Sequence, residues 1–572
     1  MPFIQAKKDF VAVVRKALGE QINLEEKDIV LPPNQAMGDL SLPTFVLAKF
    51  LKKSPNEIAL AAVSGFVKRG FILKIEARGP YINAFFNRTK FAKAVLDRIK
   101  KEKSKYGFAR GSGGRPVLLE FVSPNTNKPL HLGHLRNAFL GFSLAELLLC
   151  AGNKVIRSVL YNDRGINIMK SVLAYQKKGE GQTPKNADVK GDHFVGNYYV
   201  AFDRLSKEDA ALEGEAQENL LKWEKGDKDL LALCKKMNKW AEEGFEETLG
   251  RIGVSFDAVY KESALYKRGK KIVFDAFKKG IFVKDEKGNI IAPLEKFNLP
   301  NKVVLRADGT AVYATTDLAL ARERWKKYKF SRLIYIVGME QDLHFRQLFK
   351  IFELLGEPFA KSSEHLSYNW VFLPEGRMKS REGRVVDADA LLDELQALAL
   401  RELKLRYETL GEAEALARAE AIAQAALKYY LLEVDPKSDI HFNPAASLAF
   451  SGRTGPYVQY SYARISSLFR ISGKPLSAAA VPERVSETEH KILVLLSRYG
   501  EILASSAAAR NPSELEKYLF ELSKAFSDFY EKEPILKAQG NTRNFRLALS
   551  KSVSAVLESG LKISGIVAPK QM

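Results

Sequence analysis

The sequence indicates a multidomain α/β protein, in which a parallel-sheet domain lies between a smaller α+β domain and an all-α domain. A chain of 572 residues, 46% of them hydrophobic, is long enough for several separate cores. From Pro116 onward, short apolar runs alternate with helical stretches, which is typical of a Rossmann-type parallel sheet. From about residue 388 the pattern becomes almost wholly helical. These changes of pattern divide the chain into three predicted domains.

The first predicted domain spans residues 1–106 and has a mixed α+β pattern. An amphipathic helix over 1–18 is followed by a loop containing Gly38, by further helices, and by strand-like runs over 71–77 and 81–86. The stretch 110–115 is rich in glycine and charge, which predicts a linker to the next domain.

The second predicted domain spans residues 107–387 and contains the parallel sheet. Strands are predicted over 117–122, 155–160 and 333–337, and a helix over 135–150 follows the first of them. Between the second and third of these strands, the highly charged stretch 169–299 has helical periodicity without clear strand alternation. We therefore expect a helical insertion there. Residues 388–572 form the third predicted domain, which is all-α.

The charge balance points to a polyanionic partner. Lys and Arg number 89 against 68 Asp and Glu, giving a net charge of +21. Basicity alone does not separate nucleic acid from an anionic membrane, but no run of 18 apolar residues predicts a spanning helix. Charged residues interrupt the first helix, unlike a secretory signal, and two cysteines are too few for a disulfide framework. We expect a cytoplasmic protein that does not bind membranes.

The segment Ser123–His134 (SPNTNKPLHLGH) is the first candidate site. It joins an apolar strand to a helix, so it lies where the positive end of the helix favours anions. Gly133 lets the backbone approach a ligand closely, while His131 and His134 can donate to phosphate. Lys128 can reach the same anion. The sequence therefore predicts a nucleotide triphosphate site.

A second candidate site follows the turn at Asp308-Gly309. If the chain is helical after this turn, Tyr313 and Asp317 are four residues apart and share one face of the helix. A carboxylate with an aromatic hydroxyl beside it suits a planar guanidinium, which binds carboxylates in bidentate geometry.

Taken as a unit, Ser123–His134 resembles the signature of class I aminoacyl-tRNA synthetases, and its Ser-Pro-Asn start and Lys-Pro spacer resemble arginyl-tRNA synthetases in particular. Leu132 stands where the family motif has isoleucine. The segment 306–319 resembles the arginine-binding stretch of the same family. The resemblance implies that the three domains are an N-terminal tRNA-contacting domain, a catalytic domain and a C-terminal anticodon-binding domain. It also implies that His131, His134 and Lys128 are catalytic, and that arginine is bound by Glu120, Ser123, Asn125, His134, Tyr313, Asp317 and Gln341.

Residues 376–386 (GRMKSREGRVV) resemble the phosphate-clamping loop of class I synthetases, usually Lys-Met-Ser-Lys. Arg377 stands for the first lysine of that loop, and Lys379-Ser380 reverse its last two residues. The resemblance implies that Arg377 is catalytic and that Met378, Lys379, Ser380 and Arg381 join His131, Gly133, His134 and Lys128 in binding ATP. In many members a lysine before the histidine motif replaces the second lysine of the loop, and Lys128 matches it.

Residues 451–465 resemble the opening of the family's anticodon-binding domain. Aromatic rings beside arginines can stack on splayed bases of single-stranded RNA loops, which makes Tyr457, Tyr460 and Arg464 candidate tRNA contacts.

The resemblance implies an arginine-tRNA ligase acting in translation. It would be a monomer that uses ATP and L-arginine to charge tRNA(Arg), with Mg²⁺ entering on the ATP and no dedicated protein metal site. It also implies that arginine activation requires bound tRNA. Three alternatives are a synthetase for another amino acid, a noncatalytic RNA-binding paralogue, and a nucleotidylyltransferase. Tyr313 with Asp317 argues against a synthetase for another amino acid. The intact His131 and His134 argue against the paralogue, and the length of the chain argues against the nucleotidylyltransferase.

Overall fold

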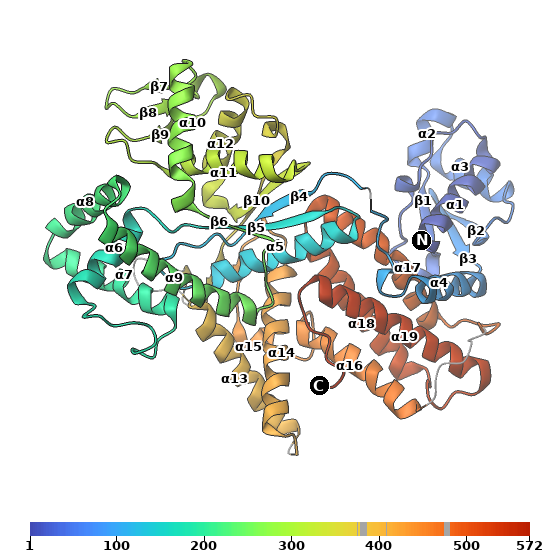
Figure 1. The fold of residues 1–572 in the computed structure, drawn as a ribbon. Helices are drawn as coiled ribbons and strands as arrows, with labels where there is room; N and C mark the ends of the chain where they lie inside the picture. The colour runs from blue at the N-terminus through green and yellow to red at the C-terminus, as the bar shows by residue number, and fades with distance from the viewer. Residues whose placement is uncertain (112, 374–375, 378–385, 408, 474–480) are drawn as a thin grey trace.

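The computed structural model describes all residues except 112, 374–375, 378–385, 408 and 474–480. Figure 1 shows a central sheet with an N-terminal domain on one side, helices of an insertion on the other, and a helical bundle below. The first and last parts of the chain lie side by side. The N-terminal domain therefore packs on the C-terminal helices, although the two lie at opposite ends of the sequence.

The N-terminal domain is an α+β module, as predicted. Its three-stranded antiparallel sheet has the order β1-β3-β2, and Ser54 begins one of the covering helices with a capping box to Glu57. Its elements are α1 (Pro2–Leu18), β1 (Leu40–Pro43), α2 (Phe45–Leu51), α3 (Pro55–Ser64), β2 (Ile72–Arg78), β3 (Tyr81–Phe86) and α4 (Arg88–Glu102).

The central sheet has five parallel strands in the order β11-β10-β4-β5-β6. All four residues of the middle strand are buried, as expected for a strand covered on both faces. From the middle strand, β4, the chain continues to β5 on one side and returns later to β10 on the other side. The strand order therefore switches direction beside β4, and ligands bind at such switch points in parallel sheets. The strands are β4 (Val117–Glu120), β5 (Val155–Tyr161), β6 (Ala258–Lys261), β10 (Arg332–Gly338) and β11 (Ser363–Tyr368).

Helices cover both faces of this sheet (Figure 1). The helix after the first strand begins at Leu132, three residues earlier than predicted, because His131 caps it. The covering helices are α5 (Leu132–Cys150), α10 (Tyr266–Lys278), α11 (Tyr313–Tyr328) and α12 (Asp342–Leu354).

The stretch 169–299 is not helical throughout, which corrects that expectation. Strand β6 lies within it and forms the edge of the central sheet, and a small antiparallel sheet, β7-β8-β9, follows. The edge strand has four residues of alternating burial next to charged neighbours, so it gives a weak sequence signal. The remaining elements are α6 (Ile166–Lys178), α7 (Gly191–Glu208), α8 (Ala211–Lys225), α9 (Lys228–Arg251), β7 (Val283–Lys284), β8 (Ile290–Ala292) and β9 (Lys302–Leu305).

The last third of the chain is mainly helical. A short sheet, β13-β12-β14, joins it to the preceding domain. Its elements are β12 (Val371–Leu373), β13 (Gly376–Arg377), α13 (Ala388–Arg406), α14 (Glu412–Leu432), β14 (Ile440–His441), α15 (Pro444–Ser447), α16 (Gly455–Ser472), α17 (Glu487–Ala509), α18 (Ser513–Lys532) and α19 (Gly540–Ile563).

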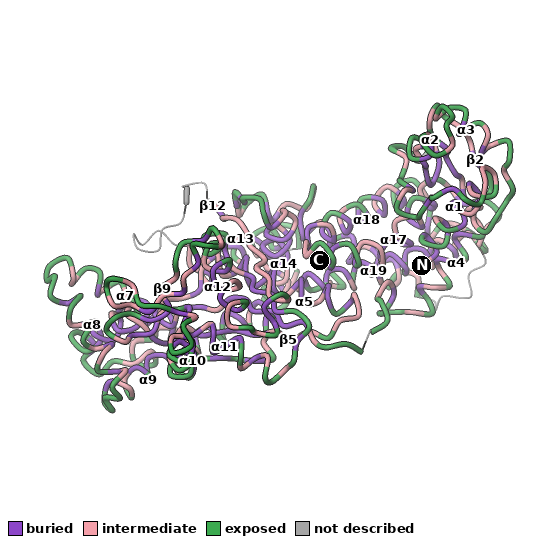
Figure 2. Tube along the Cα trace, turned by 90° about the horizontal axis from the view of Figure 1, so that it is seen from above, coloured by how far each residue is buried: buried purple, intermediate pink, exposed green. Residues whose placement is uncertain are grey.

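Helix α17 is long and apolar enough to cross a membrane by length and composition. It contacts α1, α4, α5, α18 and α19, so its apolar face is used in packing between domains. Figure 2 shows buried segments running through the molecule from the insertion helices to the N-terminal domain. One hydrophobic core joins the N-terminal domain to α16–α19, and the other two cover the two faces of the central sheet.

Candidate active site

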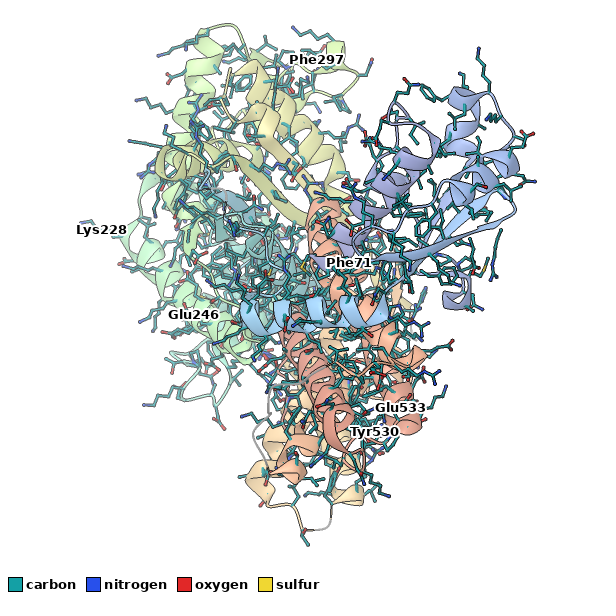
Figure 3. The ribbon with its side chains drawn as sticks, turned by 90° about the vertical axis from the view of Figure 1, so that its right-hand side faces the viewer. Phe71, Lys228, Glu246, Phe297, Tyr530 and Glu533 are labelled. Atoms are coloured by element: carbon teal, nitrogen blue, oxygen red, sulfur yellow. The ribbon has the colours of Figure 1, made fainter. Side chains whose placement is uncertain are left out.

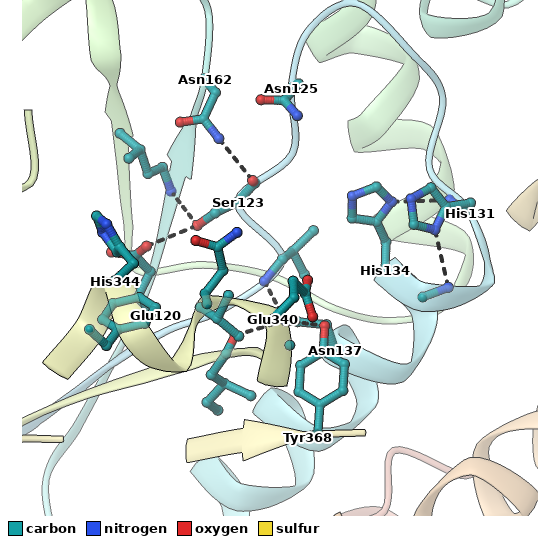
Figure 4. Close-up of a pocket in the computed structure, with 18 of the residues that line it drawn as sticks. Glu120, Ser123, Asn125, His131, His134, Asn137, Asn162, Glu340, His344 and Tyr368 are labelled. Carbon is teal, nitrogen blue, oxygen red and sulfur yellow. Dashed lines mark hydrogen bonds between the residues drawn. The ribbon is translucent and has the colours of Figure 1, made fainter. Parts of the chain in front are cut away.

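A cavity of about 490 Å³ opens at the carboxyl ends of β4, β5 and β10. Figure 4 shows it between the start of α5 and the helices that follow β10. Every predicted ATP- or arginine-binding residue outside the clamp loop lines it. These are Glu120, Ser123, Asn125, Lys128, His131, Gly133, His134, Tyr313, Asp317 and Gln341. Segments that are about 220 residues apart in the sequence thus share one site.

The two histidines form a reciprocal cap at the start of α5. The Gly133 amide donates to Nδ1 of His131 at 3.2 Å, and the His131 amide donates to Nδ1 of His134 at 3.2 Å. Burial lowers the pKa of His131 to about 3 and that of His134 well below its usual value. Both rings are therefore neutral at pH 7. With each Nδ1 accepting, the proton of each ring lies on Nε2, the atom left to donate to a ligand.

Lys128 supplies positive charge beside the histidines. Burial lowers the pKa of its ammonium group, and its charge in turn helps to lower the pKa of both imidazoles. In the described part of the chain, no carboxylate forms a salt bridge with it. A partly desolvated cation at a helix N-terminus favours an anionic ligand.

The backbone turn after β4 is strained. Val122 has φ 70° and Ser123 has φ 38°, values that are rare for a β-branched residue such as valine. Asn137 of α5 holds this turn: its Oδ1 accepts from the Val122 amide at 2.6 Å, and its Nδ2 donates to the Ile336 carbonyl at 2.7 Å. Sequence reasoning missed Asn137, although it lies only three residues after His134.

The end of the cavity away from the histidines is acidic. Asp317 lies four residues after Tyr313 on α11, and its Oδ2 contacts Nε2 of His344 at 2.9 Å. Tyr313 is 59% exposed and lines the cavity together with Gln341. His344 therefore orients the carboxylate that was predicted to bind a guanidinium.

Glu120 already has a cationic partner within the chain. Its Oε2 accepts from Nη1 of Arg324, which is fully buried and also donates from Nη2 to Ser158 Oγ at 2.8 Å. Its other oxygen accepts from Ser123 Oγ at 3.3 Å, at the wall of the cavity. The negative charge of Glu120 is thus largely balanced, whereas among the described residues Asp317 contacts His344 and forms no salt bridge with a lysine or an arginine.

A further buried carboxylate, Glu262, lies behind Asp317. Its Oε1 accepts from Thr316 Oγ1 at 3.3 Å and lies 3.5 Å from Nη1 of Arg164. Burial raises its pKa to about 7, and the charges of Asp163 and Asp317 add to this effect. Asp163 accepts from the Ser263 amide at 2.7 Å and from the Ser263 hydroxyl at 2.5 Å.

The predicted clamp loop lies largely outside the described residues. These include Met378, Lys379, Ser380 and Arg381, and of Arg377 only the backbone, in β13, is described. The segment that follows the loop is paired with the histidine motif: the Leu132 amide donates to the Val386 carbonyl, and the Ala388 amide donates to the Leu130 carbonyl.

The predicted RNA contacts on α16 separate into two environments. Tyr457 packs against Phe520 and donates to Ser527 Oγ at 3.3 Å, so its ring serves packing between helices. Arg464 lies over the rings of both Tyr460 and Tyr530, at 4.7 and 4.9 Å. Both of these tyrosines are exposed, and Figure 3 labels Tyr530 in the helical domain. Sequence reasoning missed Tyr530 because it lies on α18.

Three family models match successive parts of the chain. Residues 5–86 match the arginyl tRNA synthetase N terminal domain, residues 96–443 match the catalytic domain of class I (R) tRNA synthetases, and residues 458–572 match the DALR anticodon binding domain. Among curated proteins, an arginine--tRNA ligase of Treponema denticola is 44% identical, covering 96% of this chain and 94% of that protein.

The chain belongs to the arginyl-tRNA synthetase family.

An arginine--tRNA ligase of Parabacteroides distasonis is 38% identical to this synthetase, with 98% of each chain covered. The fold agrees with that of solved structures. The Thermus thermophilus arginyl-tRNA synthetase has a TM-score of 0.81 at 24% identity, covering 99% of this chain and 100% of the other. A methionyl-tRNA synthetase of Mycobacterium tuberculosis has a TM-score of 0.52 at 11% identity, covering 80% and 92%. The predicted family and fold class are confirmed.

The catalytic-domain model extends through residue 443, beyond the predicted boundary at 388. Helices α13 and α14 contact α5, so they pack on the parallel-sheet domain, whereas α16 contacts α18 and α19. The domain boundaries at residues 106 and 388 therefore stay predictions.

Proposed function

We propose that this synthetase is an arginine-tRNA ligase whose two chemical steps take place in the cavity beside β4. The observation that carries the proposal is that one cavity has a phosphate-binding character at one end and a carboxylate at the other. The first step would join L-arginine to the α-phosphate of ATP. The second would transfer the arginyl group to the 3′-terminal adenosine of tRNA(Arg).

At the histidine end, Nε2–H of His131 and of His134 would donate to phosphate oxygens, and Lys128 would neutralise their charge. In the first step a carboxylate oxygen of arginine attacks the α-phosphorus and pyrophosphate leaves, so negative charge accumulates on the phosphoryl oxygens. Donors fixed beforehand by the reciprocal histidine cap would stabilise this charge without rearranging. In the second step the terminal ribose hydroxyl attacks the arginyl carbonyl and AMP leaves.

At the acidic end, Asp317 would bind the substrate guanidinium, with His344 holding the carboxylate in place and Tyr313 beside it. Ser123, Asn125 and Gln341 would hold the polar atoms around the α-carbon, because they lie between the two ends of the cavity. Glu120, paired with Arg324, would act through its oxygen on Ser123 rather than as the principal guanidinium ligand.

Magnesium would enter the site bound to ATP. The polar groups at the histidine end are a lysine and two neutral imidazoles that can donate hydrogen bonds, a set that suits phosphate better than a free cation. Within the described ranges one cluster of possible ligands occurs outside this cavity, Asp192, His193 and Asp389. The ammonium of Lys190 lies 2.7 Å from Asp389 and provides positive charge to that cluster.

The tRNA would be bound by its phosphates through the net charge of +21 and by stacking at Tyr460, Arg464 and Tyr530. In this proposal the protein acts as a monomer in the cytoplasm, and the N-terminal domain contacts the tRNA at a second place.

The test is exchange of labelled pyrophosphate into ATP, measured for each amino acid with and without total tRNA. We expect exchange with arginine, dependent on tRNA, and formation of arginyl-tRNA in the same mixture. Exchange with a different amino acid but not with arginine would overturn the substrate assignment, and charging without any need for Asp317 would overturn the proposed pocket.

A further inference from the structure

The N-terminal domain is fixed to the helical domain by a continuous interface. Helices α1 and α4 both contact α17, and one hydrophobic core includes residues from both domains. In Figures 1 and 3 the N-terminal domain lies directly on the end of the helical bundle. Across this interface Lys7 pairs with Glu501 at 2.6 Å, and the buried Tyr106 hydroxyl donates to the Leu496 carbonyl at 2.9 Å.

A buried hydrogen-bonded pair, Asp39 with His490, lies within this largely apolar interface. Nε2 of His490 on α17 is 2.5 Å from Oδ1 of Asp39, and the two side chains are 0% and 6% exposed. The loop containing Gly38 and Asp39 was noted in the sequence, but the active site makes no use of it.

The N-terminal domain holds Asp39 firmly on its own side. The Phe86 amide donates to Oδ2 of Asp39 at 2.7 Å, and the Asp39 amide donates to the Ala84 carbonyl at 2.8 Å. The preceding Gly38 has φ 137°, and a Cβ there would lie 3.0 Å from the Ala84 carbonyl oxygen, so the loop approaches β3 too closely for another residue. The carboxylate is therefore fixed to β3 and has one oxygen left for His490.

The ring of His490 is enclosed on its other sides by aromatic rings. Phe86 and Phe91 approach it at centroid distances of 6.3 and 6.1 Å, and Phe71 packs on Phe91. Its Nδ1 has no hydrogen-bond partner within the described structure. The contact to Asp39 is thus the directional contact of this ring, whereas apolar packing alone would tolerate small rotations between the two surfaces.

A buried pair of this kind is poor evidence for stability, because desolvation offsets most of its attraction. Its directional geometry can instead select one arrangement among several similar packings. We propose that the Asp39–His490 pair is a positioning pair, which sets the angle between the N-terminal domain and the anticodon-binding domain so that both contact one tRNA. Neither residue touches the reacting atoms.

The inference rests on the proposed ligase function, since it needs a rigid ligand that spans both domains. If the angle is wrong, contact by one domain no longer places the tRNA within reach of the other, and the gain from binding at two places is lost. The effect should therefore fall on tRNA and spare the small substrates.

The experiment compares four variants of the full chain in steady-state arginylation: Asp39→Asn, His490→Leu, the double variant, and His490→Gln. For the first three we expect the KM for tRNA to rise about tenfold, with the KM for arginine and ATP and kcat within about twofold of wild type. The double variant should resemble the stronger single variant. His490→Gln keeps a donor near the position of Nε2 and should restore most of the loss.

Asp9→Asn is the matched control. Asp9 is also buried and accepts a backbone amide, that of Phe71 just before β2, at 3.0 Å, but its other oxygen is bonded to Gln5 within the N-terminal domain. It should lower thermal stability and leave the KM for tRNA unchanged. An equal rise in this control, additive effects in the double variant, or an unchanged KM for tRNA in Asp39→Asn would each overturn the proposal.

A measurement of the distance between the two domains tests the proposal even if a variant does not charge tRNA. Both native cysteines, Cys150 and Cys234, are buried, so spin labels can be placed at new surface cysteines on α3 and α18. We expect one narrow distance distribution in wild type and a broader one in His490→Leu, and equal widths would contradict the pair's role. Absence of arginylation in wild type would instead contradict the ligase function.

Discussion

At the scale of single residues, the site depends on which atoms remain free after the protein has bonded its own side chains. His131 and His134 use Nδ1 to cap α5, and their lowered pKa values keep them neutral. Protonation at Nδ1 would break this cap. In the proposed function, the donors to phosphate are therefore the Nε2–H groups of neutral rings.

Substitution of His131 can separate the cap from phosphate binding. Asparagine keeps an acceptor near Nδ1 but has no donor at the Nε2 position, so His131→Asn should keep its thermal midpoint while kcat falls on the order of 10²-fold. His131→Ala should lose about 1 kcal/mol of stability as well. Thermal melts and single-turnover charging would check both, and full activity in His131→Asn would exclude the donor role.

Asp317 should determine affinity for arginine. We expect Asp317→Asn to raise the KM for arginine about 100-fold, equivalent to roughly 3 kcal/mol, because the guanidinium would lose its charged partner. Asp308→Asn is the control, since this exposed carboxylate bonds Thr310 in the turn before α11 and Gln217 of α8, and it does not line the cavity. Steady-state charging at varied arginine would measure both. Equal KM values in the two variants would contradict the pocket.

Glu262 should make stability depend on pH. Its pKa is raised from 4.5 to about 7, so its contribution to stability is full below pH 4.5 and is lost as pH rises through 7. Ionisation at pH 8 should cost about 3 kcal/mol, which Glu262→Gln avoids. Thermal midpoints without ligands should therefore favour Glu262→Gln more at pH 8 than at pH 5. A difference independent of pH would contradict this account.

At the scale of elements, the unit that builds the site is the connection from β4 through its strained turn to α5. The turn holds positive φ at Val122 and Ser123 because Asn137 bonds the Val122 amide and links it to β10. Strain at this position aims Ser123 Oγ at Glu120 and at the Leu160 amide. Packing from α5 thus determines the shape of the arginine end of the cavity.

Asn137→Ala should destabilise the protein by about 2–3 kcal/mol, because it leaves the buried Val122 amide without a partner. Arginine binding should weaken as the turn relaxes. Asn153→Ala, at the other end of α5, removes only a bond to the Leu148 carbonyl and serves as control. Urea unfolding and the KM for arginine would be measured. A change in stability alone would show that the turn does not shape the pocket.

Residues in contiguous motifs were predictable, whereas residues whose role comes from distant partners were not. The strand, glycine and histidine pattern placed the cavity residues from Glu120 to His134 correctly at one edge of the sheet. Arg324, Glu262 and Tyr530 carry no local signal, because their partners lie about 50–200 residues away. Strand β6 was missed because its four alternating residues lie in charged sequence.

At the scale of the whole molecule, the basic chain presents separate regions for the two ends of an extended ligand. The cavity lies beside the central sheet, while the aromatic cluster of Tyr460, Arg464 and Tyr530 lies in the helical domain. The N-terminal domain is held on that helical domain by a shared core. In the proposed function, one tRNA would contact all three regions together.

Salt should discriminate between the two kinds of substrate. Phosphate contacts release counterions, so the KM for tRNA should rise at least about tenfold between 50 and 200 mM KCl. The KM for arginine should change by less than about twofold, because its site is partly enclosed. Charging assays across this range would check both. Parallel changes would point to a general effect on folding.

The shared core of the N-terminal domain and α17 has a consequence for synthesis. Synthesis of the N-terminal domain ends at about residue 106, but the helix that covers its apolar side, α17, begins only at Glu487. At about 5–20 residues per second, the nascent chain waits roughly 20 to 75 seconds for this partner. During that time Phe3, Phe10, Phe86 and Phe91 belong to a core that α17 does not yet cover. We expect this exposed apolar surface to bind chaperones until the C-terminal helices have been synthesised.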